Sequence, residues 1–161
     1  MSPSVEDMTL TLSTPQSRLK IYKSSPELYD AMMALSTASS KDVDPKLGEL
    51  IKIRASQINR CAFCLDMHTR DARKIGVSEQ KLDVLAAWSE AGDLFDETER
   101  AALALTEAIT VLGPHGVPDD VYEDAAAAFS DRELGQVIAL AVTINAWNRI
   151  NAAVHTAPPR R

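Results

Sequence analysis

The stretch from Pro45 to Gly76, PKLGELIKIRASQINRCAFCLDMHTRDARKIG, decides the fold class of this chain. Pro45 suits the first position of a helix, and the apolar residues that follow it recur at helical spacing. Asn59 and Arg60 interrupt this pattern just before the first of two cysteines, and Gly76 is placed to end a second helix. The stretch therefore predicts two consecutive α-helices that are joined by a short break.

The rest of the chain shows the same helical periodicity and contains no convincing strand run. We expect an all-α single domain of about six or seven helices over residues 25–155, with an N-terminal arm at 1–24 and a frayed tail at 156–161. Short alternations within the arm predict extended pieces or a segment that lies on a neighbouring molecule. The expected helices cover residues 25–35, 45–58, 61–74, 78–88, 96–112, 118–129 and 131–154, and a loop is expected at 36–44.

The last of these helices, residues 131–154, is apolar on more than one face. A helix of this kind is either central to its own domain or shared with a second subunit. Alanines at positions 125–128 would also permit a close approach between helices. We therefore predict that the protein forms a homo-oligomer.

Composition and charge exclude several classes of function. The 161 residues carry 17 Lys and Arg against 23 Asp and Glu, a net charge of −6, whereas nucleic-acid binding needs a clustered positive field. No apolar run approaches the length of a membrane span, and residues 1–14 lack the pattern of a secretory signal. We expect a soluble cytoplasmic protein with neither nucleic acid nor membrane as its partner.

The only two cysteines, Cys61 and Cys64, lie in register with His68. Spacings of three and four residues place all three side chains on one narrow face of a helix. The helix N-terminus would stabilise a thiolate at Cys61, and His68 could take the proton of Cys64. Two thiols and a base on one face are typical of a peroxide-reducing or disulfide-reducing site.

Other interpretations of these residues stay open at this point. The cysteines could be small buried hydrophobes, although this leaves the register of the histidine unexplained. They could also join His68 in a zinc site, with His115, His155 or a carboxylate as the fourth ligand. A thioredoxin-like site is disfavoured because it would need β-strands around the cysteine pair. Trp88 and Trp147 are interpreted as core or interface residues.

The combined spacing Glu49-x₁₁-Cys61-x₂-Cys64-x₃-His68 resembles the core motif of the AhpD-like alkylhydroperoxidase family, within the carboxymuconolactone decarboxylase superfamily. Flanking segments also resemble an uncharacterised branch of that family, and the resemblance extends over about residues 18–155. The segments that carry it are 53–59, 66–72, 99–103 and 144–149, together with Trp88 and Phe95.

The resemblance implies an all-helical fold that assembles as a trimer or hexamer. The implied activity is reduction of hydroperoxides, with Cys64 as the peroxidatic cysteine, Cys61 as its disulfide partner, His68 as the base and Glu49 as a proton-relay carboxylate. An external dithiol, such as a lipoyl-type protein, would reduce the disulfide again. No bound cofactor and no metal are implied.

This chain departs from the family pattern at Phe63, where the best-known hydroperoxidase has a histidine. An apolar side chain cannot relay a proton, so this departure bears on the donor, the substrate or the rate. Two alternative functions use the same scaffold. One is a lyase related to carboxymuconolactone decarboxylase, which does not rely on a cysteine pair, and the other is a non-enzymatic thiol redox sensor.

Overall fold

The computed structural model describes residues 18–161, and every regular element within that range is helical. The prediction of an all-α single domain is therefore confirmed, with more helices than expected. Two short 3₁₀ helices, Leu85–Glu90 and Gly92–Leu94, follow the fifth α-helix. The α-helices are α1 (Ile21–Ser24), α2 (Pro26–Ser39), α3 (Pro45–Ile58), α4 (Ala62–Lys74), α5 (Glu79–Val84), α6 (Glu97–Thr110), α7 (Asp119–Ala128) and α8 (Asp131–Val154).

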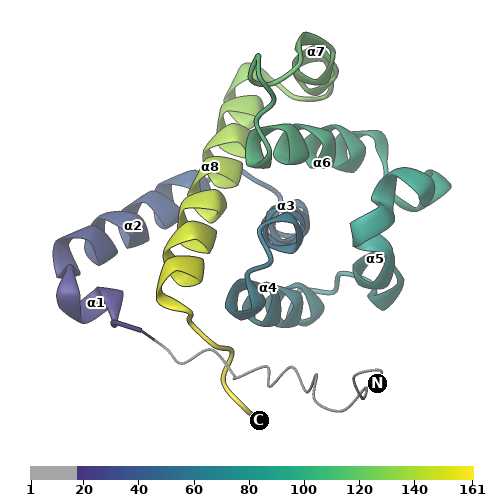
Figure 1. The fold of residues 1–161 in the computed structure, drawn as a ribbon. Coiled ribbons are helices and arrows are strands. Elements are labelled where there is room, and N and C mark those ends of the chain that lie inside the picture. The colour runs from purple at the N-terminus through teal and green to yellow at the C-terminus, as the bar shows by residue number, and fades with distance from the viewer. Residues whose placement is uncertain (1–17) are drawn as a thin grey trace, which may run out of the picture.

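Helix α3 is the centre of the domain, and α4, α6 and α8 pack around it (Figure 1). Its sequence explains this position because two different faces of the helix are apolar. Leu47 and Ile51 belong to one cluster of buried side chains, whereas Leu50 and Ile53 belong to another. Polar residues of α3, among them Glu49, are thereby directed away from both clusters.

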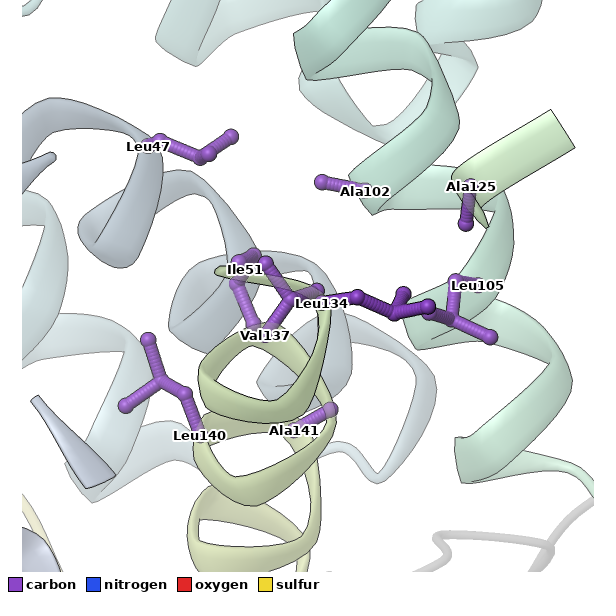
Figure 2. Close-up of a cluster of buried hydrophobic side chains, with 9 residues drawn as sticks. All are labelled: Leu47, Ile51, Ala102, Leu105, Ala125, Leu134, Val137, Leu140 and Ala141. Carbon is purple, nitrogen blue, oxygen red and sulfur yellow. The ribbon is translucent and has the colours of Figure 1, made fainter. Parts of the chain in front are cut away.

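The two buried clusters lie on either side of α3. The first joins α3 to α6, α7 and α8, as Figure 2 shows, and the second joins α3 to α4, α5, the first 3₁₀ helix and α6. The residues of the first cluster are Leu47, Ile51, Ala102, Leu105, Ala125, Leu134, Val137, Leu140 and Ala141. The residues of the second are Leu50, Ile53, Ala72, Val77, Leu82, Leu85, Trp88, Phe95 and Leu103.

Helix α8 is a central helix, which is one of the two arrangements that its apolar faces predicted, because it contacts α2, α3, α4, α6 and α7. By length and composition alone it could also cross a membrane, with a mean hydropathy of 1.2 over its most apolar window. The five helices packed around it explain part of this apolar character, since 39% of that window is buried in the structure and a core helix passes the same test. Its polar residues Asn145 and Asn148 are also buried against these neighbours.

Four side chains stabilise helix starts at the positions that the sequence predicts. Asp44 accepts hydrogen bonds from the backbone N–H groups of Lys46 and Leu47 in α3, and Ser78 accepts one from the third residue of α5. Asp96 and Ser130 form capping boxes with Glu99 and with the third residue of α8, respectively. These caps satisfy backbone donors that would otherwise lack partners, which is why the predicted helix starts agree closely with the structure.

Several predicted boundaries need correction. The alternating residues before Ser25 form the single turn α1 instead of an extended piece, because backbone N–H groups there bond to the carbonyl oxygens of Lys20 and Ile21. The loop expected at 36–44 begins only at Ser40, since serine hydroxyls bond back to helical carbonyls and α2 continues. The helix expected at 78–88 changes to 3₁₀ geometry at Leu85, and α6 ends at Thr110. Residues 1–17 of the expected arm lie outside the described range.

Candidate active site

The turn between α3 and α4 positions the two cysteines. Asn59 ends α3, and Arg60 then adopts a left-handed conformation with φ of 55°, at the turn that joins α3 to α4. Cys61 follows as the N-cap of α4, and its Sγ accepts the backbone N–H of Cys64 at 3.4 Å. The cysteine pair therefore lies at the N-terminus of α4, as predicted.

A buried network of amide side chains holds this turn in place. Asn59 Nδ2 donates to Asn145 Oδ1 at 2.8 Å and to Asn148 Oδ1 at 2.9 Å, and both acceptors belong to α8. Asn148 Nδ2 in turn donates to Ser56 Oγ at 3.0 Å, and Asn145 Nδ2 donates to Thr110 Oγ1 at 2.9 Å. These bonds connect the turn to α6 and α8 and satisfy polar groups that would be costly to bury alone.

Cys61 and Cys64 form a disulfide, with a Cα–Cα distance of 5.4 Å. Both residues are almost completely buried, with 4% and 1% of their surface exposed, respectively. Bulk water is therefore largely excluded from both sulfur atoms. In such surroundings a thiolate depends on hydrogen-bond donors supplied by the protein.

His68, Glu49 and Lys52 form a second group of polar side chains beside the disulfide. His68 Nδ1 lies 2.9 Å from Glu49 Oε2, and Lys52 Nζ lies 2.7 Å from Glu49 Oε1. Burial alone would raise the pKa of Glu49, but the hydrogen bonds and charges of His68 and Lys52 outweigh it and hold this pKa below its usual value. Glu49 is thus an ionised carboxylate at neutral pH.

The carboxylate of Glu49 also determines what His68 can do. An ionised carboxylate only accepts hydrogen bonds, so Nδ1 of His68 must carry the proton that it shares with Glu49. In the neutral ring the proton is then absent from Nε2, which keeps a free lone pair. This arrangement suits a general base that accepts a proton at Nε2 while the carboxylate at Nδ1 stabilises the protonated ring.

A cavity of about 670 Å³ opens beside Cys64 and His68, between α1, α2, α4 and α8. Both of these side chains line its wall, whereas Cys61 does not. Most of the remaining wall is apolar or aromatic, and it includes Tyr29, Phe63 and Trp147. A smaller cavity of about 240 Å³ borders Glu49 and Lys52 and brings a second opening to that carboxylate.

The structure brings together all four residues that sequence reasoning selected. Cys61 and Cys64 are bonded, Cys64 and His68 share one cavity, and His68 bonds to Glu49. Lys52 was missed, although its spacing of three residues from Glu49 was an available signal. Asn151, whose Nδ2 lies 3.6 Å from Cys64 Sγ, was also missed because the two residues are far apart in sequence.

Other residues considered from the sequence lie elsewhere. His115 is exposed in the loop after α6, and His155 ends α8. Within residues 18–161, no group of three or more His, Cys, Asp or Glu side chains is placed to hold a metal ion, so the zinc interpretation has no support there. Trp88 packs in the second buried cluster, whereas Trp147 belongs to the cavity wall and bonds through Nε1 to Ser36.

Comparison with known proteins places the chain in a family. The model of the carboxymuconolactone decarboxylase family matches residues 26–108, slightly more than half of the chain. The chain belongs to this family. Uncharacterized protein YdfG of Bacillus subtilis (strain 168) is 39% identical over 138 residues, which cover 85% of this chain and 93% of YdfG. The similarity to YdfG therefore extends over more residues than the family model matches.

Solved structures agree with this assignment and identify the AhpD-like fold. ATU0492 of Agrobacterium tumefaciens, a protein of unknown function provisionally named an antioxidant defence protein AhpD, is 38% identical with a TM-score of 0.86. The match covers 91% of this chain and all of that one. The debrominase Bmp8, crystallised with 2,3,4-tribromopyrrole, has a TM-score of 0.75 at 22% identity, with 85% of this chain and 73% of Bmp8 covered. At that identity the likeness concerns the fold alone.

Proposed function

We propose that the protein is a thiol-dependent hydroperoxide reductase whose catalytic residues are Cys64, Cys61, His68 and Glu49. The observation that carries this proposal is the placement of Cys64 and His68 on the wall of one largely apolar cavity, with Cys61 bonded to Cys64 behind it. The family assignment and the AhpD-like fold support the same chemistry.

The proposed cycle begins with the reduced pair. His68 accepts the proton of the Cys64 thiol, and the thiolate attacks the terminal oxygen of the hydroperoxide. The O–O bond breaks, Cys64 becomes a sulfenic acid, and the leaving alkoxide takes the proton from His68 to form an alcohol. Glu49 stabilises the transient imidazolium through its hydrogen bond to Nδ1.

The second half of the cycle restores both thiols. The Cys61 thiol attacks the sulfenic sulfur, which releases water and forms the disulfide seen in the structure. An external dithiol donor of the lipoyl type then supplies two electrons and two protons and leaves as its own disulfide. The pair thereby returns to two thiols, and one hydroperoxide and one dithiol are consumed in each turn.

Cys64 is proposed as the attacking thiol because general-base catalysis by His68 is worth more than stabilisation of a Cys61 thiolate by the N-terminus of α4. The N-terminus of α4 acts on Cys61, which is almost completely buried, and such an effect is worth up to about 2 kcal/mol in buried geometries. General-base catalysis is worth about 10²–10⁴-fold, or about 3–5 kcal/mol at 1.36 kcal/mol per decade. The larger effect acts on the cysteine that faces the cavity together with His68.

The cavity also bears on the substrate. A largely apolar wall around Cys64 gains free energy when it covers an organic group, whereas hydrogen peroxide has no such group to bury. We expect cumene hydroperoxide or tert-butyl hydroperoxide to react faster than hydrogen peroxide at equal concentration. Similar rates for all three would contradict a role for the cavity in substrate selection.

Thiol titration tests the proposed cycle directly. One equivalent of organic hydroperoxide should consume two thiols of the reduced protein, and a dithiol such as dihydrolipoamide should restore them through repeated turnovers. The C64S variant should not consume peroxide, whereas C61S should retain a sulfenic acid at Cys64. No loss of thiols would refute the reductase and favour the lyase. A single oxidation that no dithiol reverses would instead indicate a sensor, and sulfenic acid in C64S but not in C61S would reverse the assignment.

A further inference from the structure

Asn151 extends from α8 to the same cavity that Cys64 and His68 line. Its Nδ2 lies 3.6 Å from Cys64 Sγ, which is within hydrogen-bonding range of a sulfur acceptor, and 3.0 Å from the carbonyl oxygen of Trp147. No other side-chain donor is bonded to either cysteine sulfur within residues 18–161. The contact therefore adds to Cys64 a polar partner that belongs to a different helix.

The bond to Trp147 fixes which end of the Asn151 amide meets the sulfur. A carbonyl oxygen accepts hydrogen bonds and cannot donate them, so the group 3.0 Å from it must be the NH₂ end of the amide. The opposite orientation would place two oxygen atoms against each other. The same nitrogen has a second hydrogen, and Cys64 Sγ is the second acceptor within its reach.

The two sulfur atoms therefore have different donors. Cys61 Sγ accepts a backbone N–H at the start of α4, whereas Cys64 Sγ faces the side-chain amide of Asn151. Cys64 is 1% exposed, so water cannot replace this donor easily when the sulfur becomes negative. A hydrogen bond to an ionised acceptor is stronger than one to a neutral acceptor, so the contact favours the thiolate over the thiol.

We propose that Asn151 is a further catalytic residue, whose amide donates a hydrogen bond to the Cys64 thiolate. Within the cycle proposed above, on which this role rests, the bond acts when the thiolate forms for attack on the peroxide. It acts again when the thiolate of the external dithiol attacks Cys61, because Cys64 then leaves with the electron pair of the broken S–S bond. The amide keeps both of its protons throughout.

The test measures thiolate formation without peroxide or dithiol. The ultraviolet absorbance of the Cys64 thiolate is measured as a function of pH in three proteins. These are the C61S variant, which serves as the parent, and the same variant with N151L or N151A added. Leucine keeps the branched heavy-atom shape of asparagine but has methyl groups in place of the amide oxygen and nitrogen, and alanine gives a second, smaller variant without the donor. We expect both to move the midpoint upward by about one pH unit, which corresponds to a tenfold smaller ratio of thiolate to thiol at a fixed pH.

T143V is the matched control, because Thr143 lies on α8 and lines the same cavity but bonds to the carbonyl oxygen of Ala139. Its midpoint should equal that of the C61S parent. Midpoints of N151L and N151A that also equal the parent would overturn the proposal. N151D supplies a further check, because its carboxylate should raise the midpoint more than leucine does. An increase in N151D alone would indicate charge repulsion without a donor and would likewise overturn it.

The titration separates this proposal from the proposed function. An upward shift in a protein that consumes no peroxide would keep Asn151 as a donor to the thiolate and reject the reductase. Unchanged midpoints in a protein that reduces peroxide would do the opposite. If the protein reduces peroxide, N151L should also lower the rate of peroxide attack about tenfold at neutral pH. This difference should disappear at a pH where Cys64 is fully ionised both in N151L and in the protein that keeps Asn151.

Discussion

Replacing Glu49 by glutamine tests the proton relay with the least change of shape. In the native protein one carboxylate oxygen bonds to His68 and the other bonds to Lys52. A glutamine oxygen can accept from only one of these donors, and its NH₂ group then opposes the other. We expect glutamine to turn its oxygen toward His68, while the partly exposed Lys52 moves toward the smaller cavity.

The expected loss of rate follows from the loss of the charged acceptor that Nδ1 of the His68 imidazolium bonds to. A hydrogen bond to a charged group contributes about 1.5–3 kcal/mol, which corresponds to about tenfold to 150-fold in rate at 1.36 kcal/mol per decade. The E49Q variant should therefore slow the attack of Cys64 on an organic hydroperoxide within this range. This loss is smaller than the 10²–10⁴-fold expected when the base itself is removed.

The same substitution should change how stability depends on pH. Because the pKa of Glu49 in the folded protein lies below its ordinary value of 4.5, its ionised form stabilises the fold above that pH. This contribution is lost as the pH falls below 4.5 and through the pKa of the folded state. E49Q lacks the titrating group, so its free energy of unfolding should fall less steeply than that of the native protein as the pH is lowered below 4.5. The two free energies of unfolding should therefore become more similar at low pH.

Two measurements test these expectations. Stopped-flow kinetics give the rate of sulfenic acid formation, and urea unfolding at several pH values gives the dependence of stability on pH. E99Q is the matched control, because Glu99 is 13% exposed against 11% for Glu49 and also bonds a lysine, Lys81. It should reduce stability, since Glu99 also caps α6, but leave the rate of thiol oxidation unchanged. The relay would be refuted if E49Q reacted as fast as E99Q.

Three further predictions follow from other parts of the structure. H68A should slow thiol oxidation by 10²–10⁴-fold in stopped-flow assays, and a rate within threefold of the native one would exclude His68 as the base. N148A should lower the free energy of unfolding in urea by about 2–3 kcal/mol, because the partners Ser56 and Asn59 lose a buried hydrogen bond; a loss below 0.5 kcal/mol would contradict the network. Light scattering at micromolar concentration should give the mass of an oligomer, since α1 and α2 expose Tyr22 and Met33 among other large apolar side chains, and a monomeric mass would refute this.

Much of the fold could be predicted from local signals in the sequence. Proline at the first helical position and side chains such as Asp96 and Ser130 act within one turn, so helix starts were visible without the structure. The 3₁₀ segment at 85–90 was not, because Ala87 leaves helical geometry although neither glycine nor proline marks the place. The single turn α1 was also missed, since its residues alternate as a strand would.

The candidate site was predictable where its residues share one helix. Cys61, Cys64 and His68 lie within eight positions, so their register was visible directly. The partners of this group come from α3 and α8, and their approach depends on how three helices pack. Glu49 was found only through the family motif, and Asn151 carries no sequence signal because its contact with Cys64 joins residues 87 positions apart.

The walls of the larger cavity come from two parts of the chain, one inside and one outside the segment that the family model matches. The segment that matches the family, residues 26–108, contains Glu49, both cysteines and His68, whereas α1 and α8 lie outside it. The wall of the cavity is thus divided, because α2 and α4 contribute to it from inside that segment and α1 and α8 from outside it. If the cavity selects the substrate as proposed, exchange of wall residues that have no hydrogen bond to either sulfur, such as Ile21 of α1 and Ile144 of α8, would change which molecules fit and leave the proposed thiol chemistry in place.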